Sequence, residues 1–69
     1  MTIVKIKDEY IKLGQALKLG GLVGSGVEAK IVIQDGNVKV NNSVELQRGK
    51  KLHIGDIVSY DGETIQISQ

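Results

Sequence analysis

The chain contains no cysteine, proline, tryptophan or phenylalanine among its 69 residues, and it has a single histidine. Because cysteine is absent, neither disulfides nor thiolate metal sites can stabilise the fold, so an apolar core must suffice near the lower size limit of an independent domain. No apolar run approaches the roughly 20 residues of a membrane span, and the N-terminus lacks the apolar stretch of a secretory signal. We therefore expect one domain over residues 1–69, located in the cytoplasm and not bound to a membrane.

Catalytic and metal-binding patterns are also scarce. His53 is the only histidine, and no carboxylate stands at ligand spacing from it, so we expect a surface residue rather than a metal ligand or base. The glycines around Ser25 lack the Gly-x-x-x-x-Gly-Lys-Ser/Thr pattern of a nucleotide-binding loop. An enzyme relying on scattered carboxylates is the most distant alternative. The sequence predicts a non-catalytic protein with no cofactor and no metal.

The charges that are present are unevenly distributed. The net charge is only +1, which is low for a protein that binds phosphate. Between Tyr10 and Ile54, however, seven basic and three acidic residues give +4, whereas the two ends together carry −3. A one-sided field of this kind can attract RNA while the molecule stays nearly neutral. The alternative is that these charges simply solvate a small surface.

One helix is marked by its cap and by its periodicity. Ser25 and Glu28 have the spacing of a capping box, in which the serine hydroxyl accepts a hydrogen bond from the Glu28 amide and the carboxylate reaches back. Gly36 supplies the left-handed residue that ends the helix, and Lys30 points away from the apolar side. The apolar side consists of Ala29, Val32 and Ile33.

Two hairpins are predicted after this helix. The run Val38–Val40 alternates as a half-buried strand, which turns Lys39 to the face opposite the valines. Asn41-Asn42 can form a tight type I′ turn into a second strand over Ser43–Leu46. A later hairpin is expected to turn at Asp61-Gly62.

The N-terminal part adds a strand and a shorter helix. Alternation predicts a strand over Thr2–Lys7, with Ile3 and either Val4 or Ile6 buried. A short helix over Gly14–Leu19 is expected to pack against the second one. The predicted fold class is α+β, with two short packed helices on a small antiparallel sheet and an extra N-terminal strand.

Three motifs occur in a fixed order: LGQALK at 13–18, SGVEAKIVIQDGNVKVN at 25–41 and KLHIGDIV at 51–58. As a set they resemble the RNA-binding domain first described in ribosomal small-subunit protein four, the S-four domain, over about residues 11–60. The chain is similar to small stand-alone bacterial members of that family. The resemblance implies an RNA-linked role, with ribosome assembly or maturation as the expected process.

In that family two helices and the following hairpin, the alpha-L motif, dock on structured RNA. The resemblance implies RNA contacts at Lys12, Gly14, Ser25, Gly26, Lys30, Lys39 and Asn41. The basic segment and its polar neighbours add Gln15, Lys18, Arg48, Lys50 and Lys51 as candidates.

Some of these positions depart from the family pattern or have a structural alternative. The family often has arginine at the positions of Lys12 and Gly26 and aspartate at that of Gly14. Losing a guanidinium removes bidentate phosphate geometry, although Gly26 can let a phosphate approach the helix start. Ser25 is first of all a helix cap, and Lys50-Lys51 can be solvated charges at a sheet edge.

The aromatic content favours one class of target. Tyr10 and Tyr60 are the only aromatic residues, so the chain lacks the platform that stacks several splayed bases. We therefore expect a monomer that recognises structured RNA, such as ribosomal RNA or a ribosomal particle, by phosphate contacts and shape. The alternative is a protein-interaction adaptor that uses the strand Thr2–Lys7 or the apolar region Leu19–Val23.

Overall fold

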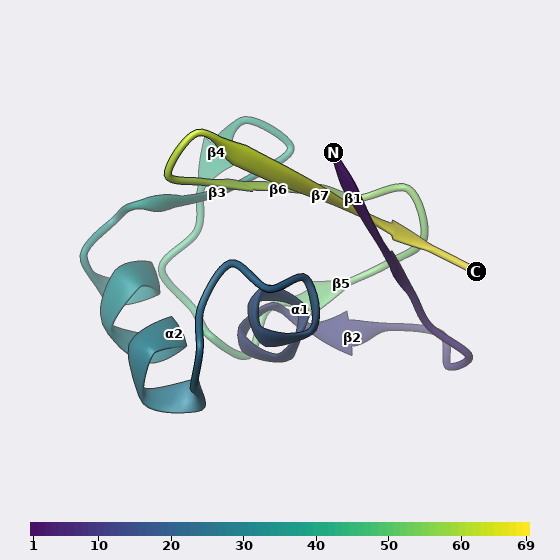
Figure 1. The fold of residues 1–69 in the computed structure, drawn as a ribbon, viewed down its shortest axis with the longest axis horizontal. Helices are drawn as coiled ribbons and strands as arrows, with labels where there is room; N and C mark the ends of the chain where they lie inside the picture. Colours follow the sequence, from purple (N-terminus) through teal and green to yellow (C-terminus); the bar gives the residue numbers. More distant parts are fainter.

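The computed structural model describes residues 1–69 as two layers, a sheet above and two helices with a short ribbon below (Figure 1). The elements in chain order are β1 Thr2–Lys5, β2 Ile11–Lys12, α1 Leu13–Leu19, α2 Gly26–Gln34, β3 Val38–Val40, β4 Ser43–Val44, β5 Lys51–Leu52, β6 Ile57–Tyr60 and β7 Glu63–Ser68. Neither helix is long and apolar enough to cross a membrane.

The main sheet has five strands in the order β1-β7-β6-β3-β4. Its neighbours are antiparallel except for β1, which runs parallel to β7 with Val4 opposite Ile67. A separate antiparallel ribbon joins β2 to β5, with Ile11 opposite Leu52. The predicted α+β class, with two helices packed on a small antiparallel sheet, is confirmed, although the sheet is only mostly antiparallel. The β2–β5 ribbon and the parallel pairing of β1 with β7 were not predicted.

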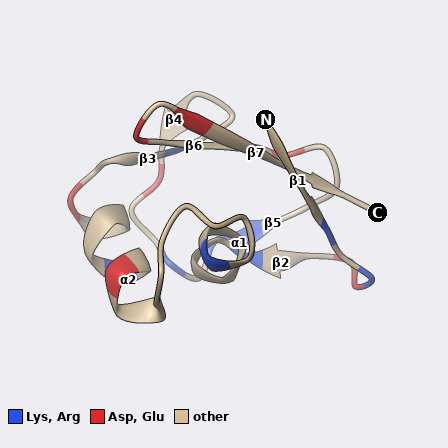
Figure 2. Cartoon of the chain, viewed as in Figure 1, with Lys and Arg blue, Asp and Glu red and all other residues tan.

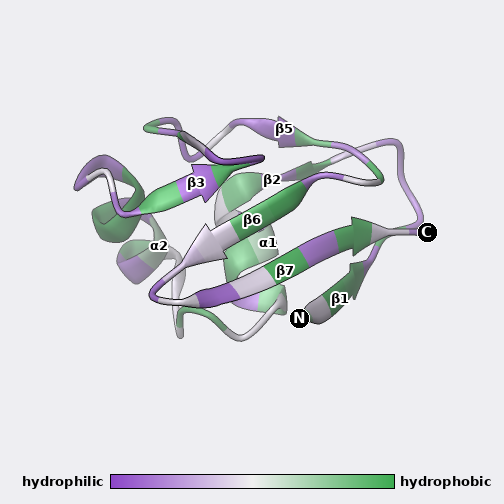
Figure 3. Ribbon diagram, turned by 90° about the horizontal axis from the view of Figure 1, so that it is seen from above, coloured by the Kyte–Doolittle hydropathy of each residue, from purple (hydrophilic) through white to green (hydrophobic).

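The core lies between the sheet and the helices, and α1 runs beneath β6 and β7 (Figure 3). Strand residues alternate, so that Val38 and Val40 face the helices and Lys39 faces the other side. The buried apolar residues are Val4, Ile11, Leu13, Ala16, Leu17, Val23, Ala29, Val32, Ile33, Val38, Val40, Leu52, Val58, Ile65 and Ile67. One continuous core therefore joins both helices, the ribbon and the sheet.

The prediction that Ile3 is buried is wrong. Ile3 is 48% exposed, whereas Val4 is 4% exposed and Ile6 is half-buried. The parallel register with β7 turns Val4 toward the helices, and adjacent residues of a strand point to opposite faces. Ile3 therefore lies on the outer face of the sheet, which no helix covers.

Both ends of α2 are capped as predicted, except that the Glu28 carboxylate bonds to a different amide. The Ser25 hydroxyl accepts a hydrogen bond from the Glu28 amide at 3.1 Å. The Glu28 carboxylate reaches back to the amide of Gly24, at 2.6 Å, rather than to that of the cap residue. Gly36, with φ of +80°, follows the end of the helix in the left-handed conformation. The cap and the stop signal are confirmed.

Both hairpin turns are also confirmed. Asn41 and Asn42 have φ of 49° and 72°, and Asp61 and Gly62 have φ of 53° and 78°. Two successive positive values are the signature of a type I′ turn, whose twist matches the twist of paired strands. The strand expected over Ser43–Leu46 is shorter, because β4 ends at Val44.

Candidate nucleic-acid interface

The basic loop before β5 is fastened to the beginning of α1. The Leu13 amide donates to the Lys50 carbonyl at 2.9 Å, and the Gly14 amide donates to the Arg48 carbonyl at 3.1 Å. The adjoining ribbon pairs Lys12 with Lys51. Segments far apart in the sequence thus meet, and the first amides of α1 already have protein acceptors. This helix start therefore offers these amides to no phosphate.

Gly14 allows this close approach. A Cβ atom at Gly14 would stand 2.6 Å from Cγ and 3.2 Å from Cδ of Arg48. Such a contact forces the arginine side chain to move, because Cβ atoms essentially never come so close to another atom. The role of Gly14 in this structure is to let Arg48 lie across α1.

Arg48 and two lysines surround an open cavity of about 310 Å³, which we call the basic hollow. Its lining contains no apolar and no acidic side chain. The lining residues are Lys12, Gly14, Gln15, Lys18, Gly26, Arg48 and Gly49. Figure 2 shows basic segments in α1, β2 and β5 on the helix side of the molecule. Three cations without a carboxylate give the basic hollow a positive field that attracts anions.

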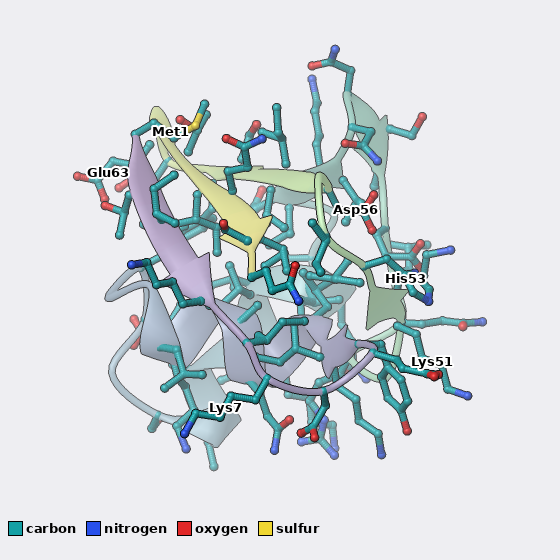
Figure 4. The ribbon with its side chains drawn as sticks, turned by 90° about the vertical axis from the view of Figure 1, so that its right-hand side faces the viewer. Met1, Lys7, Lys51, His53, Asp56 and Glu63 are labelled. Atoms are coloured by element: carbon teal, nitrogen blue, oxygen red, sulfur yellow. The ribbon has the colours of Figure 1, made fainter.

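Lys50 and Lys51 line a different cavity, of about 370 Å³, at the Asn41 hairpin. Glu45 and Asp56 also line it, so its charge is mixed. Figure 4 shows Lys51, His53 and Asp56 along one edge of the molecule, with Lys7 toward the other side of the view. This cavity is less suited to a phosphate than the basic hollow, because its carboxylates repel anions.

The side chain of Asn41 serves the fold. Its Nδ2 donates to Oδ1 of Asp56 at 3.0 Å, and its Oδ1 accepts from the Ile57 amide at 3.0 Å. The other carboxylate oxygen of Asp56 accepts from the His53 amide at 2.8 Å. Asn41 thereby joins the first hairpin to the turn before β6, and both ends of its carboxamide are engaged within the protein.

These bonds change the acidity of Asp56. Partial burial alone would raise the pKa of this carboxyl. The hydrogen bonds from the His53 amide and from Asn41, together with the positive charges of His53 and Lys50, outweigh burial and lower the pKa below its ordinary 3.8. Asp56 is therefore held as a carboxylate by the turn that it organises.

The remaining candidate residues are dispersed. Lys39 lies on the outer face of the sheet, opposite Ser59 and Val44. Lys30 is exposed on α2 and lines neither cavity. Ser25 is engaged as the cap of the same helix. The basic residues predicted from the sequence therefore do not all converge on one face. Six of the candidate residues, of which only Lys12, Lys18 and Arg48 are basic, line the basic hollow together with Gly49.

Two basic residues outside residues 11–60 lie next to the basic hollow. Lys5 and Lys7 line a further cavity together with Gln15 and Lys18, which also line the basic hollow. By charge alone, these lysines belong to the two ends of the chain, which together carry −3. Only the path of the chain from β1 to β2 reveals their position beside α1.

Of the two surfaces expected to bind a protein partner, only the exposed strand is present. Strand β1 lies at an edge of the sheet, so one side of its backbone has no neighbouring strand. In the region Leu19–Val23, Leu19 is 68% exposed, but Val23 is buried in the core. This region therefore does not form a continuous apolar patch. No three His, Asp or Glu side chains gather closely enough to hold a metal ion.

Several known proteins resemble this chain in sequence or in fold. Residues 4–68 match the family described as S4 domain. RlbA of Bacillus subtilis (strain 168), named as a probable ribosome maturation protein, is 41% identical over 59 residues, which cover 86% of this chain and 83% of RlbA. YbcJ of Escherichia coli (strain K12), whose name describes it provisionally as RNA-binding, is 39% identical over 61 residues, covering 88% of this chain and 87% of YbcJ.

The solution structure of Escherichia coli YbcJ is described as revealing an αL motif involved in RNA binding. It matches this fold with a TM-score of 0.77 at 36% identity, over 100% of this chain and 89% of YbcJ. The similarity therefore extends beyond the motifs at residues 11–60 to the first and last strands of the sheet.

Proposed function

Because the chain belongs to the S4 domain family, as its three motifs predicted, we propose that it binds structured RNA through the basic hollow and catalyses no reaction. The observation that carries this proposal is the lining of the basic hollow, where Lys12, Lys18 and Arg48 stand without an opposing carboxylate. Phosphate oxygens of RNA are acceptors for such side chains, and they supply the sequence-independent part of the affinity.

Arg48 is the central contact in this proposal. Its guanidinium is planar and always charged, so it can hold two oxygens of one phosphate at once. Gly14 and the bond to the Arg48 carbonyl fix where this side chain starts. Lys12 and Lys18 act as further point charges in the same lining, and Lys12 stands where the family often has arginine.

The RNA target belongs to the same proposal. RlbA is named for ribosome maturation, and we extend this role to the present chain, with ribosomal RNA or a ribosomal particle as the partner. Residues 1–69 would act as one RNA-binding domain and as a monomer, since the basic hollow is complete within one chain. A ribosomal target implies a cytoplasmic location.

Two double variants with the same change in charge test the proposal. Arg48→Gln with Lys18→Gln removes two charges from the basic hollow, and Lys30→Gln with Lys39→Gln removes two from elsewhere. We expect the first pair to weaken binding to a structured ribosomal RNA fragment by about tenfold or more, and the second pair to weaken it much less. Urea unfolding of each variant checks that the fold is intact.

Each remaining outcome has a definite meaning. If the second pair loses as much affinity as the first, the interface extends over α2 and β3 and the assignment to the basic hollow is wrong. If the wild-type protein binds no ribosomal RNA at low salt, the RNA-binding function itself is contradicted. The adaptor alternative, with the open edge of β1 as its binding surface, would then lead.

A further inference from the structure

A second cavity adjoins the basic hollow on the other side of Gln15 and Lys18. It has a volume of about 560 Å³ and lies between the chain from β1 to β2 and helix α1. Its lining residues are Lys5, Ile6, Lys7, Asp8, Tyr10, Ile11, Gln15, Lys18 and Leu19. We call it the tyrosine hollow. Because Gln15 and Lys18 line both cavities, a strand of RNA can pass from one to the other over these two residues.

The lining of the tyrosine hollow differs in chemistry from that of the basic hollow. Three lysines provide positive charge, while four side chains of the lining are apolar or aromatic. A phosphate alone needs no apolar wall, whereas a nucleotide presents a charged backbone and a flat base that stacks on aromatic and apolar groups. The mixture therefore fits a whole nucleotide.

Tyr10 provides the flat surface in this cavity. Its side chain is 38% exposed, and the Lys51 ammonium lies 4.8 Å from the centre of its ring. His53 lies nearby, with the two ring centres 6.5 Å apart and the planes tilted by 52°. The Lys51 ammonium lies over one face of the ring, so a base would stack on the opposite face.

The single carboxylate of the lining, Asp8, also favours a base at this end. Asp8 precedes Tyr10 by two residues, and a carboxylate repels a phosphate. The same group accepts hydrogen bonds from the amino groups of adenine, guanine and cytosine. Lys5, Lys7 and Lys18 are then available to bind the phosphate of the nucleotide.

We propose that the tyrosine hollow binds one unpaired nucleotide of the RNA, with its base stacked on Tyr10, beside the phosphates held in the basic hollow. This inference rests on the proposed function and makes it more specific. The recognised RNA would be a duplex interrupted by an unpaired nucleotide, and not a continuous duplex. The sequence gave no sign of a stacking site, because it contains only two tyrosines. The structure shows that Tyr10 lines a cavity together with three lysines, and one ring in such a cavity can bind a single base.

The test compares two short RNA hairpins that differ only in one unpaired nucleotide in the stem. We expect the wild-type protein to prefer the hairpin with the unpaired nucleotide by at least about fivefold, as expected for one stacked base. Tyr10→Leu should remove most of this preference and leave affinity for the continuous stem nearly unchanged. Tyr10→Phe should retain the preference, because its ring can still stack.

A fluorescent adenine analogue at the unpaired position gives an independent signal. Stacking on Tyr10 should change its emission on binding to wild-type protein or Tyr10→Phe, but not on binding to Tyr10→Leu. If Tyr10 only supports the β2–β5 ribbon, Tyr10→Leu lowers affinity for both hairpins equally and the inference is overturned. Equal affinity of the wild-type protein for both hairpins also overturns it, while RNA binding by the basic hollow stands. Binding to neither hairpin contradicts the proposed function as well.

Discussion

The side chain of Arg48 lies across Gly14, so closely that a Cβ atom on the glycine would stand 2.6 Å from Arg48 Cγ. The residues are far apart in the sequence, and the bond from the Gly14 amide to the Arg48 carbonyl holds them together. The first amides of α1 are bonded within the protein. Gly14 and Arg48 therefore contribute to the basic hollow as part of its lining, and not through free amides.

The first prediction concerns this pair. Gly14→Ala should displace Arg48 and reduce affinity for structured RNA by about tenfold, the value of one lost charge-assisted contact. In the background of Arg48→Ala, both close contacts are gone and the Arg48 carbonyl oxygen lies at an ordinary van der Waals distance of 3.7 Å, so Gly14→Ala should then change affinity very little. Fluorescence anisotropy of labelled RNA measures all four proteins. Equal losses in both backgrounds would show that Gly14 does not act through Arg48.

The second prediction concerns the cap of α2. Ser25→Ala removes the hydroxyl that accepts from the Glu28 amide, and it should lower the free energy of unfolding by roughly 0.5–2 kcal/mol. Ser43→Ala is a suitable control, because Ser43 is exposed in the short strand β4. Urea unfolding compares the two variants. An unchanged midpoint for Ser25→Ala would refute a stabilising cap, and any RNA defect of this variant must be corrected for its folding.

The third prediction is a dependence of stability on pH. The pKa of Asp56 is lowered in the folded protein, so the folded state binds this proton less readily than the unfolded chain. The stabilisation is therefore complete above the unfolded pKa near 3.8 and is lost as the pH falls through the folded value. Between about pH 5 and pH 3, the unfolding free energy should fall more steeply for the wild type than for Asp56→Asn. Parallel curves would contradict the charged network at this turn.

Features set by neighbouring residues were predictable from the sequence. The cap at Ser25, the stop at Gly36 and the turn at Asn41-Asn42 each depend on a few adjacent residues whose backbone preferences are strong. The three motifs, in their order, were enough to indicate the family. Predicting Ile3 as buried failed because the buried face of β1 is set by its register with β7, at the other end of the chain.

The site was predictable in composition but not in arrangement. Six candidate residues do meet in the basic hollow, yet the sequence did not show that Gly14 serves to admit Arg48. The β2–β5 ribbon aligns the start of α1 with the basic loop before β5. Each of its strands has only two residues, which is too short to produce a periodic pattern in the sequence. Lys39 was grouped with the others by charge, whereas the alternation of β3 places it on the opposite face of the sheet.

The most direct test of the account is the salt dependence of RNA binding by the wild type and by Arg48→Gln. If three to five phosphates are neutralised, the logarithm of the wild-type affinity should fall against log salt with a slope of roughly 2 to 4. Loss of one phosphate contact should reduce the slope of Arg48→Gln by about 1, with Lys39→Gln keeping the wild-type slope. A slope for Arg48→Gln equal to that of the wild type would show that Arg48 contacts no phosphate and would contradict the assignment of RNA binding to the basic hollow.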